Sequence, residues 1–153
     1  DNLELVRLLL DQGADLESRS KNGSTPLHTA TAVRNLEVSQ LLLSRGANLE
    51  TMNVDGDTPL HLASRTFSLQ VVELLLDQGA HLEARNNTGN TPLHLACNHD
   101  IQIARLLLDR GANVEATTLA RTTPLSLACQ TGHVEMVWLL VRRCPWLVVD
   151  GQE

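Results

Sequence analysis

The sequence predicts an all-α protein built as a solenoid of short repeated units, with β-turn fingers between them. Thirty of the 153 residues are leucine and only three are aromatic, so leucine-bearing helices rather than strands must supply the core. The tripeptide Thr-Pro-Leu and the dipeptide Gly-Ala each recur four times at intervals of 32 or 33 residues. A fixed period of this length is typical of stacked repeat proteins.

The Gly-Ala copies divide the chain into segments that together account for every residue. A partial unit at 1–12 is predicted to be a second helix, four full units follow, and the last ten residues are a decayed unit or a cap. The full units and the final segment are 13–45, 46–78, 79–110, 111–143 and 144–153. The third full unit is one residue short where its two helices meet, between Ala96 and Ile101, and we expect that turn to close locally.

Each full unit carries start and stop signals for two helices. Threonine before proline is a helix start, because the hydroxyl can cap an unpaired N–H and proline at the first position loses no bond. The short first helix holds an alanine that lets a neighbouring helix approach, and the longer second helix holds a leucine triplet at helical spacing. The glycine of Gly-Ala is expected to end that helix. The polar stretch that follows, with Gly23, Gly56 or Gly89, is expected to form a finger.

The pattern G-A-x-L-E-x-x-x-x-x-G-x-T-P-L-H-L-A, followed by L-x-V-V-x-L-L-L, resembles the ankyrin repeat. The resemblance covers the four full units and the preceding helix, Leu3 to Leu10. It implies a stack of hairpin, helix and helix in which each unit contacts only its neighbours. It also implies that His28, His61 and His94 hydrogen-bond between units, with Ser126 supplying a hydroxyl in the fourth unit.

Two departures from the family pattern lead to expectations about the surface. Glutamate stands where the family commonly places asparagine, and we expect a solvated acidic face at Glu17, Glu50, Glu83 and Glu115. Arg121 replaces the finger glycine of the other units. A positive φ at a residue other than glycine costs about 1 kcal/mol, so we expect a distorted or mobile fourth finger.

The totals disfavour several classes of function. A formal charge of −6 repels nucleic acid and anionic lipid surfaces. The longest apolar run, Met136 to Val141, is much too short to span a bilayer. We find no catalytic constellation, metal cluster or cofactor motif, and expect a protein that is not an enzyme and needs no cofactor. Three cysteines fit a reducing compartment, so we expect a cytoplasmic or nuclear protein. Because the sequence begins inside a repeat, we also expect a monomeric fragment of a larger protein.

The cysteines are not expected to form a disulfide. Cys97 and Cys129 occupy equivalent positions one unit apart, about 8–10 Å from each other and beyond disulfide reach. Both are predicted to be buried. Cys144 stands in the decayed last unit and is predicted to be the most accessible thiol.

Comparing the units with one another separates packing positions, which repeat, from positions that vary and are expected to be exposed. In the resembling family the varying positions of the fingers and first helices line a concave groove that grips proteins. We therefore predict partner binding by Arg19, Lys21, Asn22, Ser24, Val33, Met52, Val54, Asp55, Asp57, Arg65, Thr66, Arg85, Asn87, Thr88, Asn90, Asn98, His99, Leu119, Thr122, Gln130 and Thr131. The alternatives are a targeting or regulatory arm of a larger enzyme or signalling protein, and a structural spacer.

The three aromatic residues form a second group of candidates. Phe67 occupies a position that holds glycine in the fourth unit, and it is either folded over its own helices or exposed as a partner anchor. Trp138 stands where the other second helices are polar, so we expect it to face outward. The segment that contains Trp146 either caps the array over Trp138 or helps to dock a neighbouring domain.

Overall fold

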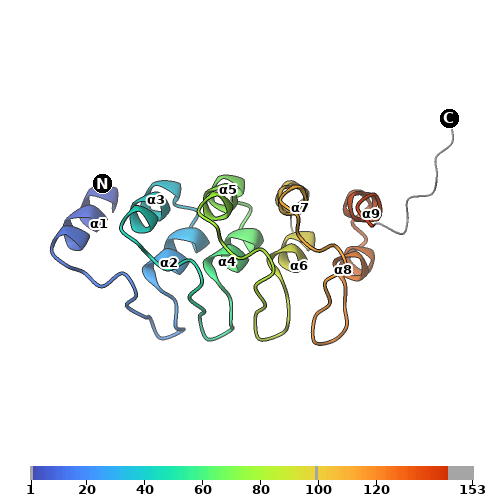
Figure 1. Ribbon diagram of the computed structural model, residues 1–153, viewed down its shortest axis with the longest axis horizontal. Helices are drawn as coiled ribbons and strands as arrows, with labels where there is room; N and C mark the ends of the chain where they lie inside the picture. The colour runs from blue at the N-terminus through green and yellow to red at the C-terminus, as the bar shows by residue number, and fades with distance from the viewer. Residues whose placement is uncertain (1, 99, 145–153) are drawn as a thin grey trace.

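The computed structural model describes residues 2–98 and 100–144, and within these residues the chain is helical with no β-strand (Figure 1). The all-α repeat solenoid predicted from the sequence is thus confirmed. The helices are α1 (Asn2–Asp11), α2 (Pro26–Ala32), α3 (Leu36–Ser44), α4 (Pro59–Arg65), α5 (Leu69–Asp77), α6 (Pro92–Cys97), α7 (Ile101–Asp109), α8 (Pro124–Thr131) and α9 (Val134–Val141).

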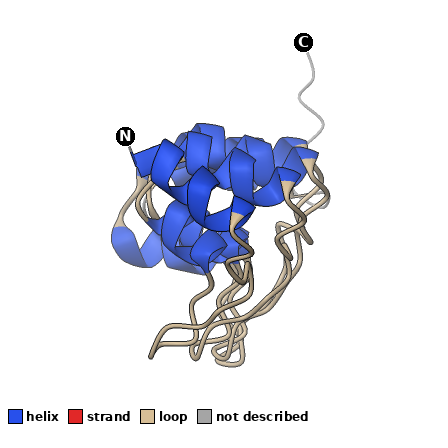
Figure 2. Cartoon of the chain, turned by 90° about the vertical axis from the view of Figure 1, so that its left-hand side faces the viewer, coloured by secondary structure: helices blue, strands red, loops and turns tan. Residues whose placement is uncertain are grey.

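The helices form two layers, and the fingers project from one side of them (Figures 1 and 2). The first helices α2, α4, α6 and α8 stack side by side, and the second helices α1, α3, α5, α7 and α9 form the parallel row above them. Leucines of both layers meet in the core, where Leu60, Leu75, Leu93 and Leu107 are fully buried. No unit could bury these side chains alone, so neighbouring units stabilise one another.

The Thr-Pro-Leu-His motif joins each unit to the next through its histidine. In the first unit, the Thr25 main-chain N–H donates to His28 Nδ1 at 3.2 Å, so the ring is protonated at Nε2 and donates to the Asp57 carbonyl at 2.9 Å. His61 and His94 make the equivalent bonds to the carbonyls of Asn90 and Thr122, at 3.0 and 3.1 Å. The bonds between units implied by the family resemblance are therefore confirmed.

The fourth unit replaces this histidine with Ser126. Its hydroxyl lies 2.9 Å from the Thr123 hydroxyl, so the local half of the interaction survives in the form expected from the sequence.

The glutamate column is a second set of links between units. Its four side chains are exposed or half-exposed, in line with the acidic face expected from the sequence, but three of them are also bonded to the main chain. Glu17 Oε1 accepts from the Asn48 N–H, Glu50 Oε1 from the His81 N–H and Glu83 Oε1 from the Asn113 N–H, each at 2.8 Å. Each carboxylate bonds the first residues of the following unit, in the loop that comes directly after the second helix of its own unit. Hydrogen bonds to a charged acceptor are among the stronger ones, so these side chains support the stack.

The fingers form a ladder with one main-chain hydrogen bond between each pair of neighbours. The N–H groups of Val54, Asn87 and Leu119 donate to the carbonyls of Asn22, Asp55 and Thr88 at 3.0–3.1 Å. The glycine of each accepting finger must therefore let the next finger approach: a Cβ at Gly56 or Gly89 would lie 2.7 Å from the main-chain nitrogen of Asn87 or Leu119. These glycines also have positive φ, so two constraints select glycine there.

The expected distortion of the fourth finger is wrong. Arg121 adopts a φ of +59°, and its N–H donates to the Thr118 carbonyl at 2.9 Å, as the finger glycines do in the other units. The side chain is tolerated because this is the last finger in the described residues, so no following finger there lies against its Cβ. Arg121 still carries the conformational cost of a positive φ, but its Cβ does not collide with a following finger in the described residues.

The short third unit closes its turn as expected. The Asp100 N–H donates to the carbonyl of Ala96, four residues earlier, whereas the Asn35 N–H donates to Ala30, five residues earlier. Both side chains then cap the following helix: Asp100 accepts from the Gln102 and Ile103 N–H groups, and Asn35 accepts from that of Val38. The deletion therefore removes one turn residue without losing the cap of α7.

The structure corrects two predictions about the cysteines, and all three thiols are free. Cys97 is buried as predicted, but Cys129 is exposed, because α8 belongs to the last unit of the described stack and no further first helix packs against it there. Cys144 is buried rather than accessible, since it packs against the core that includes Met136 and Leu140. Burial raises the pKa of the Cys97 thiol to about 12 and also raises that of Cys144.

The glycine constraints predict a difference between two matched substitutions. Gly46→Ala and Gly89→Ala both place alanine at positive φ, which costs about 1 kcal/mol, but only Gly89→Ala also forces a Cβ against the next finger. Overpacking of this kind adds about 1–3 kcal/mol. We expect urea denaturation followed by circular dichroism to show the larger loss of unfolding free energy for Gly89→Ala. Equal losses would contradict the close-approach argument.

The thiol environments predict selective labelling. In the native protein, iodoacetamide is expected to modify Cys129, because the thiolate is the reactive form and this side chain is exposed. Cys97 and Cys144 are expected to react only after denaturation. Mass spectrometry of peptides from the native protein checks the order, with Cys129→Ser as the control that should abolish native labelling.

Candidate functional site: the concave cleft of the first two units

The first two full units form a cleft of about 400 Å³ between their fingers and first helices. The first finger contributes Ser20, Asn22 and Ser24, and the second contributes Asn53 and Asp55. Helices α2 and α4 form the floor with His28, Thr29, Ala32, Val33, Leu62 and Arg65. The cleft thus lies where the family resemblance places the binding surface.

The floor of the cleft contains apolar surface that is partly uncovered. Val33 ends α2 with 67% of its surface exposed, and Ala32 next to it is also exposed. Thr29 stands where the other units carry Leu62, Leu95 or Leu127, so the first unit has a smaller and more polar side chain at this position. An exposed valine on a rigid helix end offers apolar surface that a partner can cover.

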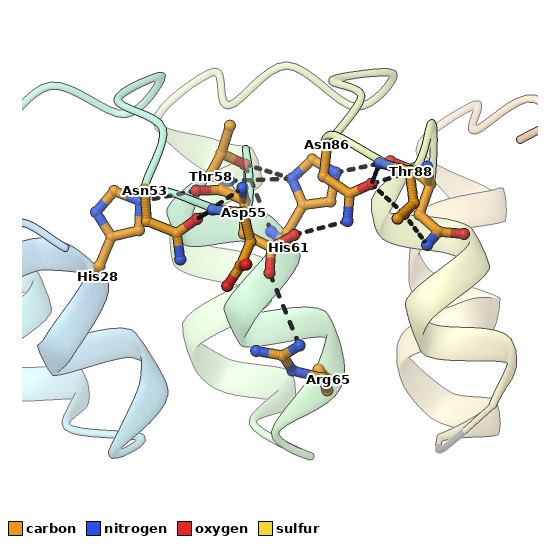
Figure 3. A network of polar contacts seen from close by, with 10 residues as sticks. His28, Asn53, Asp55, Thr58, His61, Arg65, Asn86 and Thr88 are labelled. Atoms are coloured by element: carbon orange, nitrogen blue, oxygen red, sulfur yellow. Dashed lines mark hydrogen bonds and ion pairs between the residues drawn. The ribbon is translucent and has the colours of Figure 1, made fainter. Parts of the chain in front are cut away.

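The second finger is held in shape by the Asn53 side chain. Its Oδ1 accepts from the N–H groups of Asp55 and Asp57 at 2.9 and 3.0 Å, and Asn86 does the same in the third finger for Thr88 and Asn90 (Figure 3). These local bonds fix the turn before any partner binds. The Asp55 carboxylate therefore stands at a preorganised finger tip and is exposed.

A buried carboxylate connects this finger to the floor of the cleft. Asp57 is only 2% exposed, and its Oδ1 accepts from Asn86 Nδ2 at 2.8 Å. Its Oδ2 lies 3.7 Å from Arg65 Nη1 on α4 (Figure 3 shows Arg65 below the network). A buried charge requires such partners. Asp57 therefore pairs with the half-exposed Arg65 guanidinium at the cleft, which Asp55 also lines.

Burial shifts the titration of the three motif histidines. Desolvation lowers the pKa of His28, His61 and His94 below the ordinary 6.5, although the carbonyl that each ring bonds in the next unit opposes the shift. Protonation at Nδ1 would also set two donors against each other, because the threonine N–H already donates there. The rings are structural groups in their neutral form.

The structure sorts the predicted partner-binding residues by exposure. Fourteen side chains are exposed as expected: Arg19, Lys21, Asn22, Val33, Met52, Val54, Asp55, Arg65, Arg85, Asn87, Thr88, Leu119, Gln130 and Thr131. Four are half-buried: Thr66, Asn90, Asn98 and Thr122. His99 lies outside the described residues. The cleft brings together Asn22, Ser24, Val33, Asp55 and Arg65 of this set.

The expectation that Ser24 and Asp57 are exposed is wrong. Both side chains are buried. Asp57 lies against the preceding unit, where its carbonyl is the acceptor for His28, whereas the Ser24 main chain is bonded to Ser20 within the first finger. The main-chain groups make the hydrogen bonds at this position, so the side chain can differ between units although it does not face solvent.

Arg19 and Arg85 are exposed but have intramolecular partners. Arg19 donates to the carbonyls of Gly23 and Met52, and Arg85 donates to those of Gly89 and Thr117. Each arginine ties its own finger to the next one, so a structural role accompanies any contact with a partner.

Sequence comparison missed six residues that line the cleft: Ser20, His28, Thr29, Ala32, Asn53 and Leu62. The signal for Thr29 was present, because threonine interrupts a leucine position. Asn53 likewise varies between units, as Ser20, Asn86 or Thr118.

The aromatic candidates lie elsewhere. Phe67 is 53% exposed, with the Arg34 guanidinium 5.9 Å from its ring centroid, which favours the exposed alternative. Trp138 faces outward as predicted and is 61% exposed. Trp146 lies outside the described residues, so the capping alternative stays a prediction.

Within residues 2–98 and 100–144, the side chains of His, Cys, Asp and Glu form no group that could hold a metal ion. No helix in that part of the chain combines the length and apolar character needed to cross a membrane.

The architecture and the concave cleft define an ankyrin-type solenoid, and comparison with protein families agrees. The family model described as ankyrin repeats (3 copies) matches residues 1–86, 46–118 and 82–145. The chain therefore belongs to the ankyrin-repeat family. Ankyrin repeats are generally protein–protein interaction modules on a non-catalytic scaffold. Comparison with individual curated proteins gives no match.

The histidine links predict a stack that weakens in acid. Because the folded pKa values lie below 6.5, the unfolded chain binds protons more readily as the pH falls through 6.5, and stability is lost below that pH. We expect His61→Gln, which removes a titrating ring, to be less stable at pH 7.5 but to lose less on going to pH 5.5. Urea denaturation at both pH values tests this expectation, and His133→Gln, an exposed site, is the control. The same pH dependence in wild type and His61→Gln would contradict it.

Proposed function

We propose that this chain binds a partner protein through its concave face, with the cleft of the first two units as the centre of the interface. The observation that carries the proposal is the exposed Val33 surface in a cleft that the charged residues Asp55 and Arg65 also line. Apolar surface flanked by charges of both signs suits a folded protein surface or an extended segment.

The rigidity of the cleft supports the same proposal. Asn53 holds the second finger, Asp57 holds Arg65, and the histidine link fixes the distance between α2 and the second finger. A preorganised surface loses little conformational entropy on binding, which favours affinity. The three unpaired cysteines fit a reducing compartment, so we place this interaction in the cytoplasm or nucleus.

Matched charge changes on the two faces of the array test the proposal. Val33→Asp with Asp55→Lys alters the cleft, whereas Gln70→Asp with Glu73→Lys makes the same net change on the exposed side of α5. In affinity capture from cell extract with quantitative mass spectrometry, we expect wild type and the α5 variant to retain a common set of proteins. The cleft variant should lose that set by tenfold or more.

Two outcomes would contradict the proposed site. Equal capture by all three proteins would place the interface elsewhere, provided that circular dichroism shows the variants to be folded. Capture of nothing above empty resin would favour a structural spacer.

A further inference from the structure

A second groove lies on the opposite side of the array, between the second helices α7 and α9. It measures about 290 Å³ and is lined by Ile101, Arg105, Glu135, Trp138, Leu139 and Arg142. These helices lie at the far end of the upper row from α1 in Figure 1, in the layer that does not carry the concave cleft. The groove is therefore separate from the site proposed above.

The fold builds the same groove between α1 and α3, which provides an internal comparison. That groove measures about 400 Å³ and is lined by Leu3, Arg7, Glu37, Gln40, Leu41 and Ser44, the residues at the six equivalent positions. Arginine, glutamate and leucine are identical at three positions, and leucine replaces isoleucine at a fourth. Only two positions differ in chemistry: Gln40 against Trp138, and Ser44 against Arg142.

The tryptophan is unusual for its position. The equivalent residues of the other second helices are Arg7, Gln40, Glu73 and Arg105, all polar and exposed. Trp138 is exposed too, so packing within the described residues does not require an indole there. An exposed tryptophan with an indole N–H donor is a common anchor in protein interfaces.

Arg142 reverses the charge that three of the four other second helices carry at this position. The equivalent residues Asp11, Asp77 and Asp109 each pair with an arginine of the next unit, at 2.8, 2.8 and 2.6 Å. Arginine at position 142 cannot take that role. It instead places a second guanidinium beside Arg105 at the rim of the groove, against the single carboxylate of Glu135.

We propose that the α7/α9 groove binds an acidic segment of a partner protein through one bulky apolar side chain and its flanking carboxylates. The apolar side chain packs on the indole of Trp138 and on Leu139, and the carboxylates pair with Arg105 and Arg142. Arginine suits this role because its planar fork binds carboxylates in bidentate fashion. A chain of net charge −6 repels acidic ligands in general, so a local excess of positive charge is needed to select one.

Binding of a defined peptide tests this proposal. The probe is a blocked nine-residue peptide with a central phenylalanine flanked on each side by four Asp and Glu residues. Two control peptides replace the acids with Asn and Gln, or the phenylalanine with alanine. Isothermal titration calorimetry with the full chain should give one site for the acidic phenylalanine peptide and at least tenfold weaker binding of both controls.

Exchanging the two differing residues between the grooves makes the test specific. Trp138→Gln with Arg142→Ser gives the α7/α9 groove the chemistry of the α1/α3 groove and should abolish binding. Gln40→Trp with Ser44→Arg should create a second site and raise the stoichiometry from one to two. All four side chains are exposed, so folding is expected to be preserved.

Several results would overturn the proposal. These are equal affinity for the acidic and neutral peptides, peptide binding that survives Trp138→Gln with Arg142→Ser, and binding of phosphatidylserine vesicles without binding of the peptide. Loss of peptide binding in the Val33→Asp, Asp55→Lys variant would also overturn it, because that result assigns the peptide to the concave cleft. Capture of partners by the concave face does not depend on this groove, so either proposal can fail alone.

Discussion

The hydrogen bond from a buried histidine to a main-chain carbonyl about 30 residues later is the constraint on which the array depends. His28, His61 and His94 each accept from a threonine N–H at Nδ1, which leaves Nε2 as the donor to the next unit. The acceptor carbonyl immediately precedes the next Thr-Pro helix start. One bond therefore sets both the spacing of the first helices and the origin of each finger, and the geometry of the concave cleft follows from it.

Other links between units reinforce this constraint from separate layers of the structure. The glutamates Glu17, Glu50 and Glu83 join the loops after the second helices, and the finger ladder joins the tips. Aspartate–arginine pairs join the outer helices, although exposed pairs of this kind contribute little individually. Because these groups repeat, the residues that do not repeat can vary on both faces without changing the frame.

The helices and most of the exposed candidate residues could be predicted because the repeat encodes packing at regular positions. The wrong predictions of exposure concern residues whose burial depends on which other units lie next to them, and not on their place within the repeat. Cys97 and Cys129 are equivalent in the repeat, but only Cys97 is covered on both sides within the described stack. The position of Asp57 holds a different residue in each unit, yet Asp57 is buried. Its carbonyl makes the hydrogen bond that repeats between units, and its carboxylate pairs with Asn86 and Arg65. Such partners cannot be read from one unit alone.

Arg121 and Arg142 make the fourth unit different in kind from those before it. In an internal position, the Arg121 Cβ would fill the space that glycine leaves empty at positions 56 and 89, where an added Cβ would lie only 2.7 Å from the next finger. Arg142 would face an arginine of the following unit instead of pairing with it. The units look interchangeable by sequence, but their order is not free. A protein engineer who shuffled or duplicated repeats from this array could multiply the second and third units, whereas the fourth would need both arginines replaced and a histidine introduced at Ser126.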